Sequence, residues 1–331
     1  MKKCSKELYC QFLIAAQKQF TATHLASHTE DIAHDSITRF LSTTRLTPRI
    51  LWEYAKPFVN LNSGYLVLDD SVLDHWYGKH IGLSRWQYSG THHRVVHGIG
   101  LTTLLWTGKS NEHIPIDFRI YAPEEDGITK NQHSRAMLIL THHRGFHPDL
   151  VVMDSWYASI DTLHLIADFH WLFVCGLKGN RIVFIKQSPT KMKRLHVEDL
   201  VIPANGIIVH LKDFGTVKIF SLVVPDGKEN YYATNNLRFS SLDIRNAAAQ
   251  RWKIEEYHRG LKQTTGIEMC QATTERSQRT HIFCSILSFL ALEKKRIEEG
   301  TSWYESKRRI IADSLFLYLK QPFVKLPIRA G

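Results

Sequence analysis

Two short apolar segments of the chain run directly into a carboxylate. The first, Leu66–Ser71, reads LVLDDS, and the second, Val151–Ser155, reads VVMDS. Such runs are typical of buried β-strands, and a carboxylate is costly to bury unless it lies at the strand's end, exposed or bound. Ligand sites form at the carboxyl ends of strands in open sheets. If the two strands are neighbours, we therefore expect Asp69 and Asp154 to meet.

A third carboxylate, Glu255, lies in a segment with the spacing of a helix. Arg251 stands four residues before it and Lys262 seven after it, so the three side chains share one helical face. The apolar face that can pack on a sheet is formed by Ile254, Tyr257 and Leu261. The helix would hold Glu255 above the strand ends, with a cation on each side.

Three such carboxylates suit the metal-dependent cleavage of a phosphodiester. In-line attack needs a deprotonated nucleophile and a stabilised leaving oxygen, and two metal ions about 3.5–4 Å apart supply both. Mg²⁺, or Mn²⁺ in its place, takes oxygen ligands from carboxylates and from substrate phosphate. We expect Asp69, Asp154 and Glu255 to be catalytic and to bind two such ions. Arg251 and Lys262 would hold phosphates beside the cut.

The three segments resemble the acid motifs of the DDE transposases of bacterial insertion sequences. Residues 68–71 are similar to the first-acid motif of that family, an apolar strand followed by Asp-x-Thr/Ser. Val152–Tyr157 (VMDSWY) is similar to the second-acid motif. Arg251–Glu255 (RWKIE), together with Lys262, resembles the third-acid helix, which in one large branch carries a Tyr, Arg, Glu, Lys signature.

This resemblance extends over roughly residues 60 to 290 and has implications for the fold and the site. It implies a ribonuclease-H-like catalytic core with a β-rich insertion between the second and third acids. It also implies that Asp69, Asp154 and Glu255 bind metal. Arg251 and Lys262 would contact DNA at the transposon ends.

The chain departs from the family pattern at one position and leaves a choice at another. The signature tyrosine would stand three residues before Arg251, where this chain has Ala248, and this weakens the DNA-end contact assigned to that tyrosine. The first motif offers two acids. Asp69 is favoured because it fits Asp-x-Ser spacing, while Asp70 stays an alternative because Asp70-Ser71 mirrors Asp154-Ser155.

The order of expected elements predicts an α/β fold of ribonuclease-H-like type. Three strands come first, followed by helix, strand, helix and strand, which form a mixed sheet flanked by helices. The expected strands are 65–68, 94–106, 113–121, 150–153 and 171–176, and the expected helices are 131–142 and 160–170. This first part of the core covers 61–177. A β-rich insertion with interleaved basic residues, 178–238, follows it, with expected strands at 182–185, 207–211, 217–224 and 231–233. A third-acid helix with a C-terminal helical region, 239–331, comes last.

The N-terminal region, 1–60, is expected to be helical because apolar positions recur at helical spacing. Short helices at Thr21–Ser27 and Asp35–Leu41, the second capped by Asp35, could form a DNA-reading unit. The alternative, which the sequence alone favours, is a helical packing layer. Near the C-terminus, Ile282–Leu292 is expected to belong to a core or dimer helix.

Charge and cysteine content agree with a DNA-acting protein in a reducing compartment. The formal net charge is +10, which favours polyanions. Within the insertion, Lys193 and Arg194 are expected to contact DNA. The five cysteines are widely spaced and form no CxxC pair, and no apolar segment approaches the length of a bilayer span. We expect a soluble, cytoplasmic, nucleoid-associated protein without a membrane partner.

The leading hypothesis is a cut-and-paste transposase that cleaves double-stranded DNA at terminal inverted repeats and joins it to target DNA, working as a homodimer. A catalytically decayed relative that only binds the repeats is the alternative. A paired-carboxylate hydrolase for sugars is a third class, but such an enzyme needs two acids and no metal. Dependence on a divalent cation separates it from the other two.

Overall fold

A computed structural model of the chain describes residues 2–76, 78, 80–90, 93–188, 191–223 and 227–321. The chain forms two compact units. The α/β unit is Leu46–Arg259, and the helical unit combines the described parts of Met1–Arg45 and Gly260–Gly331. Parts of the expected insertion (189–190 and 224–226) and of the expected C-terminal region (322–331) lie outside the described residues.

An eleven-stranded mixed sheet forms the centre of the α/β unit. The strand order is β2-β3-β1-β5-β6-β11-β10-β9-β7-β8, and β4 pairs with β3 on the same edge as β2. The strands are β1 (Tyr65–Asp74), β2 (Arg85–Ser89), β3 (Arg94–Thr107), β4 (Ile114–Tyr121), β5 (Leu150–Met153), β6 (Phe173–Leu177), β7 (Ile182–Ser188), β8 (Lys191–His196), β9 (Ile207–Leu211), β10 (Gly215–Val223) and β11 (Glu229–Thr234).

Strands β1 and β5 are parallel neighbours, which brings the two acid motifs side by side. Their pairing runs from Tyr65 opposite Leu150 to Leu68 opposite Met153. The expectation that the first strand ends at its acid is wrong, because β1 continues to Asp74. The reason is its antiparallel pairing with β3, which extends over the whole of β1. The ladder with β5 nevertheless stops one residue before Asp69.

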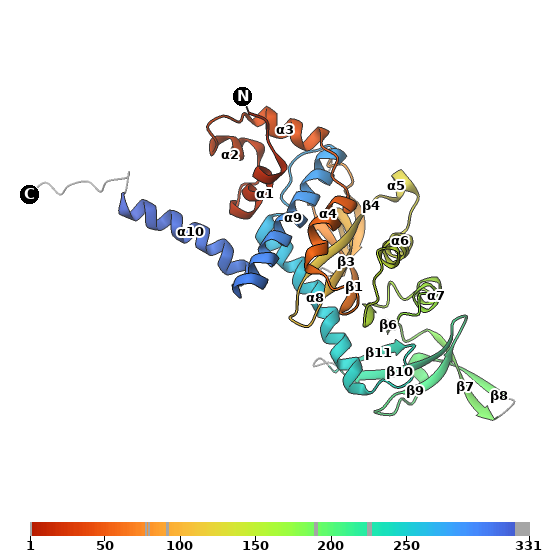
Figure 1. The fold of residues 1–331 in the computed structure, drawn as a ribbon. Helices are drawn as coiled ribbons and strands as arrows, with labels where there is room; N and C mark the ends of the chain where they lie inside the picture. Colours follow the sequence, from red (N-terminus) through yellow and green to blue (C-terminus); the bar gives the residue numbers. More distant parts are fainter. Residues whose placement is uncertain are drawn as a thin grey trace, which may run out of the picture. The chain divides into compact units, whose positions relative to one another are not determined.

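Helices cover both sides of this sheet. Figure 1 shows α6 and α7 on one side of the strands and α8 on the other. Ile244 and Ala247 of α8 are fully buried in a cluster with side chains of β5, β6 and β10. The helices of the α/β unit are α4 (Pro48–Ala55), η1 (Lys56–Phe58), α5 (Pro123–Asp126), α6 (Lys130–His143), α7 (Ile160–Asp168), η2 (Val197–Asp199) and the part of α8 (Ser241–Thr265) up to Arg259.

The β-rich segment between the second and third acids extends the central sheet. β11 pairs antiparallel with β6, and β10, β9, β7 and β8 follow it outward. Along β10, the side chains of Val217, Ile219 and Phe220 are buried. The chain therefore places the segment before α8 at the edge of the same sheet that carries the acids.

The helical unit contains four of the five cysteines and a long buried helix. Its elements are α1 (Lys6–Ala15), α2 (Ala22–Ser27), α3 (His34–Thr43), α9 (Glu275–Glu299), α10 (Trp303–Lys320) and the end of α8. The expected cap of α3 by Asp35 is wrong, because the N-cap is Ala33. Asp35 lies in the first turn, where its charge faces the positive end of the helix dipole. Ile282–Leu292 lies inside the largely buried α9.

The fold class is confirmed: a mixed sheet flanked by helices, as in ribonuclease-H-like proteins, lies within a chain that also has an N-terminal helical region. Two strands were absent from the sequence expectation, namely β2 and β8. Among the described residues, no helix is both long and apolar enough to cross a bilayer.

Candidate active site

One cavity of about 790 Å³ opens beside the first and second acid motifs. Its lining comes from β1, the loop after β5, the start of α6, the β11 edge and α8. The three acids expected from sequence, Asp69, Asp154 and Glu255, all line it, together with Arg251. Folding therefore brings together four side chains that lie up to about 190 residues apart in the chain.

Asp69 is the most enclosed of these acids. Its side chain is 14% exposed, and its Oδ1 accepts a hydrogen bond of 2.8 Å from the backbone N–H of Asp70. Burial raises the pKa of Asp69 well above its usual range, and the neighbouring charges of Asp154, Asp70 and Glu255 raise it further. Because its surroundings disfavour the ionised form, a nearby cation would strongly stabilise the Asp69 carboxylate.

Arg251 supplies positive charge between two of the acids. Its guanidinium lies 3.7 Å from Asp69 Oδ2 and 3.4 Å from Glu255 Oε1. Arg251 and Glu255 stand four residues apart on α8, which is the spacing at which side chains on one helical face meet. Arg251 thus joins the first-acid strand to the third-acid helix.

Asp154 directly follows β5, and its side chain contacts the backbone of the loop that it begins. Its Oδ1 accepts a hydrogen bond of 2.6 Å from the backbone N–H of Trp156. Burial raises the pKa of Asp154, while that hydrogen bond and the charge of Arg251 act in the opposite direction. In this Asx-type turn the carboxylate is fixed by the backbone two residues on.

The two acids of the first motif face different partners, as strand alternation requires. Asp69 lies beside Arg251 of α8, whereas Asp70 contacts the start of α6 and the loop after β5. There, Lys130 Nζ and the hydroxyl of Tyr157 each donate a hydrogen bond of 2.6 Å to Asp70. Both acids line the cavity, and Asp69 is the one in contact with Arg251 of the helix that carries Glu255.

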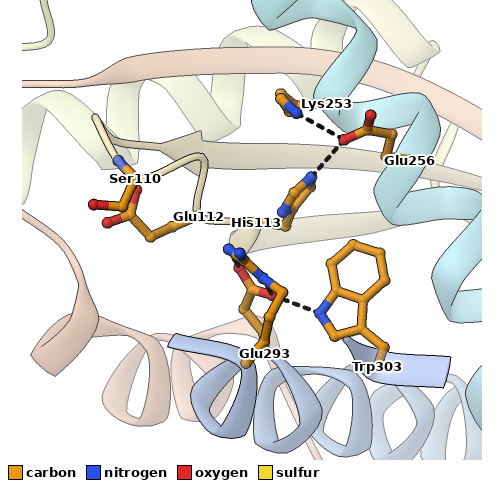
Figure 2. Close-up of polar contacts among 8 residues, drawn as sticks. Ser110, Glu112, His113, Lys253, Glu256, Glu293 and Trp303 are labelled. Carbon is orange, nitrogen blue, oxygen red and sulfur yellow. Dashed lines mark hydrogen bonds and ion pairs between the residues drawn. The ribbon is translucent and has the colours of Figure 1, made fainter. Parts of the chain in front are cut away.

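A second polar group fixes α8 against the sheet. His113, which directly precedes β4, lies with its Nε2 3.0 Å from Glu256 Oε2, and Lys253 Nζ donates to the same oxygen at 2.9 Å. Figure 2 shows His113 and Lys253 pointing toward the carboxylate of Glu256. Although burial opposes it, these two hydrogen bonds lower the pKa of Glu256. Glu256 is the neighbour of Glu255, so this contact holds the third-acid turn of α8.

The remaining residues expected to contact DNA do not line the cavity. Lys262 belongs to the helical unit, where its Nζ lies 2.6 Å from Glu268 Oε1. Lys193 and Arg194 are exposed on β8, at the outer edge of the sheet. Trp156 is 61% exposed at the cavity, with Lys178 Nζ 4.4 Å from its ring centre, whereas Tyr157 is buried.

The donor chemistry of the cavity fits a hard divalent cation. The carboxylates of Asp154, Asp70 and Glu255 repel that of Asp69, and a bound divalent cation would offset this repulsion. Among the described residues, no group of three or more His, Cys, Asp or Glu side chains is arranged to hold a metal ion. Mg²⁺ commonly takes only one or two carboxylates and completes its shell with water and substrate phosphate. Asp69 and Asp154 are the pair that could serve it here.

A family of known proteins matches the part of the chain that contains Asp69 and Asp154. The family model described as DDE superfamily endonuclease matches residues 2–196, more than half of the chain. The chain belongs to this family. The match includes both Asp69 and Asp154 and ends before α8. No curated protein matches the chain.

Membership of the DDE superfamily endonuclease family makes the chain a DDE-type nuclease that acts on DNA. The likeness to DDE transposases that the motifs indicate is therefore confirmed at the level of the family. Divalent metal ions are general in this superfamily, and the carboxylate cavity of this DDE endonuclease has suitable ligands for them.

Sequence reasoning did not assign roles to several residues around the cavity. Lys130 begins α6, and the capping box between Thr129 and Gln132 could have placed a helix start there. For Trp156 and Tyr157 the sequence suggested stacking on an unpaired base or, preferably, core packing, and not the hydrogen bond of Tyr157 to Asp70. His113 had no recognisable signal, because its partner Glu256 is 143 residues away.

Proposed function

We propose that this DDE endonuclease is a cut-and-paste transposase of a bacterial insertion sequence. It would cleave DNA at terminal inverted repeats in a metal-dependent reaction and join the freed 3′-hydroxyl to target DNA in the nucleoid. The observation that supports this proposal best is the convergence of Asp69, Asp154 and Glu255 on one cavity, with Arg251 between two of them. Family membership supports the nuclease step independently.

In this proposal, Asp69, Asp154 and Glu255 are the catalytic carboxylates and hold two Mg²⁺ or Mn²⁺ ions. When bound, the ions would activate the attacking oxygen and stabilise the leaving oxygen of the phosphodiester. Arg251 offers a guanidinium whose planar donors suit a phosphate. Because Arg251 already lies beside Asp69 and Glu255, a phosphate that it binds would also lie beside these acids.

We assign the flanking segments to DNA binding. Lys193 and Arg194 of β8, in the insertion 178–238, would contact the duplex, and Lys262 would contact the transposon end. The N-terminal region 1–60 would read the terminal repeat, and the core 61–177 with the third-acid helix in 239–331 would cut it. A homodimer would bring two ends together.

The decisive experiment measures cleavage of terminal-repeat DNA by the full chain with Mg²⁺. The wild-type protein should release 3′-hydroxyl ends, and a chelator should abolish the reaction. Asp154→Asn should reduce the rate by at least about a thousandfold, because one of the metal-binding carboxylates is lost. Asp161→Asn, at an exposed aspartate of α7, is the matched control and should cut at the wild-type rate.

Two outcomes would contradict this assignment. If Asp154→Asn cuts as well as Asp161→Asn does, the active site lies elsewhere. If the wild-type protein binds terminal-repeat DNA but never nicks it, the chain is a DNA-binding relative without catalysis. Cleavage that survives complete chelation would exclude the metal-dependent reaction.

A further inference from the structure

We propose that Asp70, Lys130 and Tyr157, here called the Asp70 clamp, are positioning residues that set the spacing between Asp69 and Asp154. This inference rests on the proposed function, because it concerns how the two acids are placed for metal ions. Asp70 follows Asp69 in β1, and Tyr157 follows Asp154 by three residues. The clamp therefore links the first-acid strand to the second-acid loop.

Both oxygens of the Asp70 carboxylate are engaged. Oδ1 accepts from the hydroxyl of Tyr157 and Oδ2 from the ammonium of Lys130, each at 2.6 Å. The side chains of Asp70 and Lys130 are only 20% and 25% exposed, and Tyr157 is buried. Charge-assisted hydrogen bonds of this length in a partly buried place hold their partners firmly. Asp70 is thus committed to these contacts and is poorly placed to serve as a metal ligand itself.

The clamp lies just beyond the last paired residues of the two strands that lead to Asp69 and Asp154. The parallel pairing of β1 with β5 ends at Leu68 and Met153, one residue before each acid. Beyond that point, side chains must fix the distance between Asp69 and Asp154. The bond from Tyr157 to Asp70 crosses this gap.

The start of α6 supports the same loop from a second direction. Asn131 Nδ2 donates a hydrogen bond of 3.1 Å to the backbone carbonyl of Trp156, and Lys130 is its neighbour in the helix. The backbone N–H of Trp156 in turn donates to Asp154 at 2.6 Å. Asn131 therefore holds the loop at Trp156 and Asp70 holds it at Tyr157, and neither residue is one of the three proposed catalytic acids. Such outer contacts around metal ligands typically contribute about 10–100-fold to metal affinity or activity.

The test compares Tyr157→Phe with Tyr304→Phe in the whole 331-residue chain. Tyr304 donates a hydroxyl hydrogen bond of similar length, 2.7 Å to Gln263, in the helical unit, so its variant controls for the loss of a hydroxyl. Binding of Mn²⁺ alone is measured by electron paramagnetic resonance, without DNA. Tyr157→Phe should weaken Mn²⁺ binding by about tenfold and raise the Mg²⁺ concentration for half-maximal cleavage similarly. KM for DNA should stay close to wild type while kcat falls, in protein that is fully folded at the assay temperature.

Two further variants separate positioning from ligation. The double variant Tyr157→Phe with Asp70→Ala should be no worse than Asp70→Ala alone, because both changes break the same bond. If Asp70→Ala abolishes Mn²⁺ binding while Tyr157→Phe leaves it intact, Asp70 is a ligand and the clamp is refuted.

Failure of this inference can be told apart from failure of the proposed function. If the wild-type protein cuts, Asp154→Asn does not, and Tyr157→Phe matches Tyr304→Phe in Mn²⁺ binding and kcat, the clamp alone is wrong. If the wild-type protein shows no metal-dependent cleavage, the proposed function fails. A loss of melting temperature in Tyr157→Phe that accounts for its lower activity would also overturn the positioning role, because the residue would then be merely structural.

Discussion

At the scale of single residues, Lys307 shows how strongly burial can act on a charged group in this chain. Its side chain is buried in the helical unit, where Nζ donates hydrogen bonds of 2.7 Å to the backbone carbonyls of Ala16 and Thr264. Burial lowers the pKa of Lys307 from 10.5 to about 8. A neutral amine keeps two N–H donors, so both carbonyl contacts survive deprotonation.

This shift predicts a pH-dependent contribution to stability. Between pH 8 and pH 10.5 the unfolded chain holds the Lys307 proton more tightly than the folded protein does, so the free energy of unfolding rises with pH. The contribution is complete above the unfolded pKa and is lost as pH falls through about 8. Relative to Lys307→Met, the wild-type protein should gain up to about 3 kcal/mol over this range, measured by urea denaturation.

The same measurement on Lys294→Met controls for the loss of a lysine side chain. Lys294 lies on α9 with its ammonium 3.7 Å from Glu298, and its side chain is half exposed. The Lys307→Met curve is compared with the curve of this variant as well as with that of the wild type. A Lys307→Met curve parallel to the wild-type curve from pH 8 to 10.5 would contradict the lowered pKa.

The choice between Asp69 and Asp70 shows what the sequence could and could not decide at this scale. The run LVLDDS indicates a strand that meets acids, but Asp-x-Ser spacing and Asp-Ser spacing are both present in it. What separates the two residues is which face of β1 each occupies and what covers that face. Arg251, which contacts Asp69, is 182 residues away in the chain, and Lys130, which contacts Asp70, is 60 residues away. No local sequence pattern predicts either contact.

At the scale of elements, the hairpin of β7 and β8 has the features of a DNA-contacting ribbon. Lys193 and Arg194 are consecutive in β8, so they point to opposite faces of the hairpin. Lys186 and Lys191 add exposed charge to it, and none of these four cations has an ion pair among the described residues. A two-stranded ribbon fits the major groove, where phosphates lie on both sides. A ribbon with charge on both faces could contact both backbones at once.

Replacing two of these cations should weaken DNA binding in a salt-dependent manner. The double variant Lys193→Gln with Arg194→Gln should lower affinity for duplex DNA and reduce the slope of log K against log salt by about 2, one for each lost phosphate contact. Fluorescence anisotropy over a salt series measures both effects. The control is Lys294→Gln with Lys295→Gln, which removes the same charge from ion-paired residues of α9. Equal slopes for the two double variants would exclude the ribbon from the DNA contact.

Element prediction succeeded where the chain carries a periodic signal and failed where pairing is set by distant partners. β5 and β9 have the expected bounds, because each is an apolar run between polar residues. β8 was missed because its sequence, KMKRLH, is basic and becomes a strand only through pairing with β7. β1 is longer than expected because β3 pairs with it beyond the apolar run.

At the scale of the whole molecule, the net charge and the cavity charge have opposite signs. The chain carries a formal charge of +10, which attracts DNA over the range of the Debye length. The cavity, in contrast, gathers Asp69, Asp154 and Glu255 around a single guanidinium, Arg251. If DNA binds at this cavity, as proposed, the charge of the whole protein attracts a phosphate that the local carboxylates repel unless divalent cations neutralise them.

This opposition predicts that removing a cavity acid strengthens DNA binding when no divalent cation is present. In a chelator, Asp154→Asn should bind duplex DNA more tightly than the wild-type protein by about 1 kcal/mol, or roughly fivefold. The difference should close when Mg²⁺ is added, because the wild-type acids are then neutralised by the ion. It should also shrink at high salt. Asp161→Asn removes the same charge from the exposed side of α7 and should give a much smaller gain. Anisotropy titrations in chelator and in Mg²⁺ measure each of these differences, and weaker binding by Asp154→Asn in chelator would show that the cavity acids do not face the DNA.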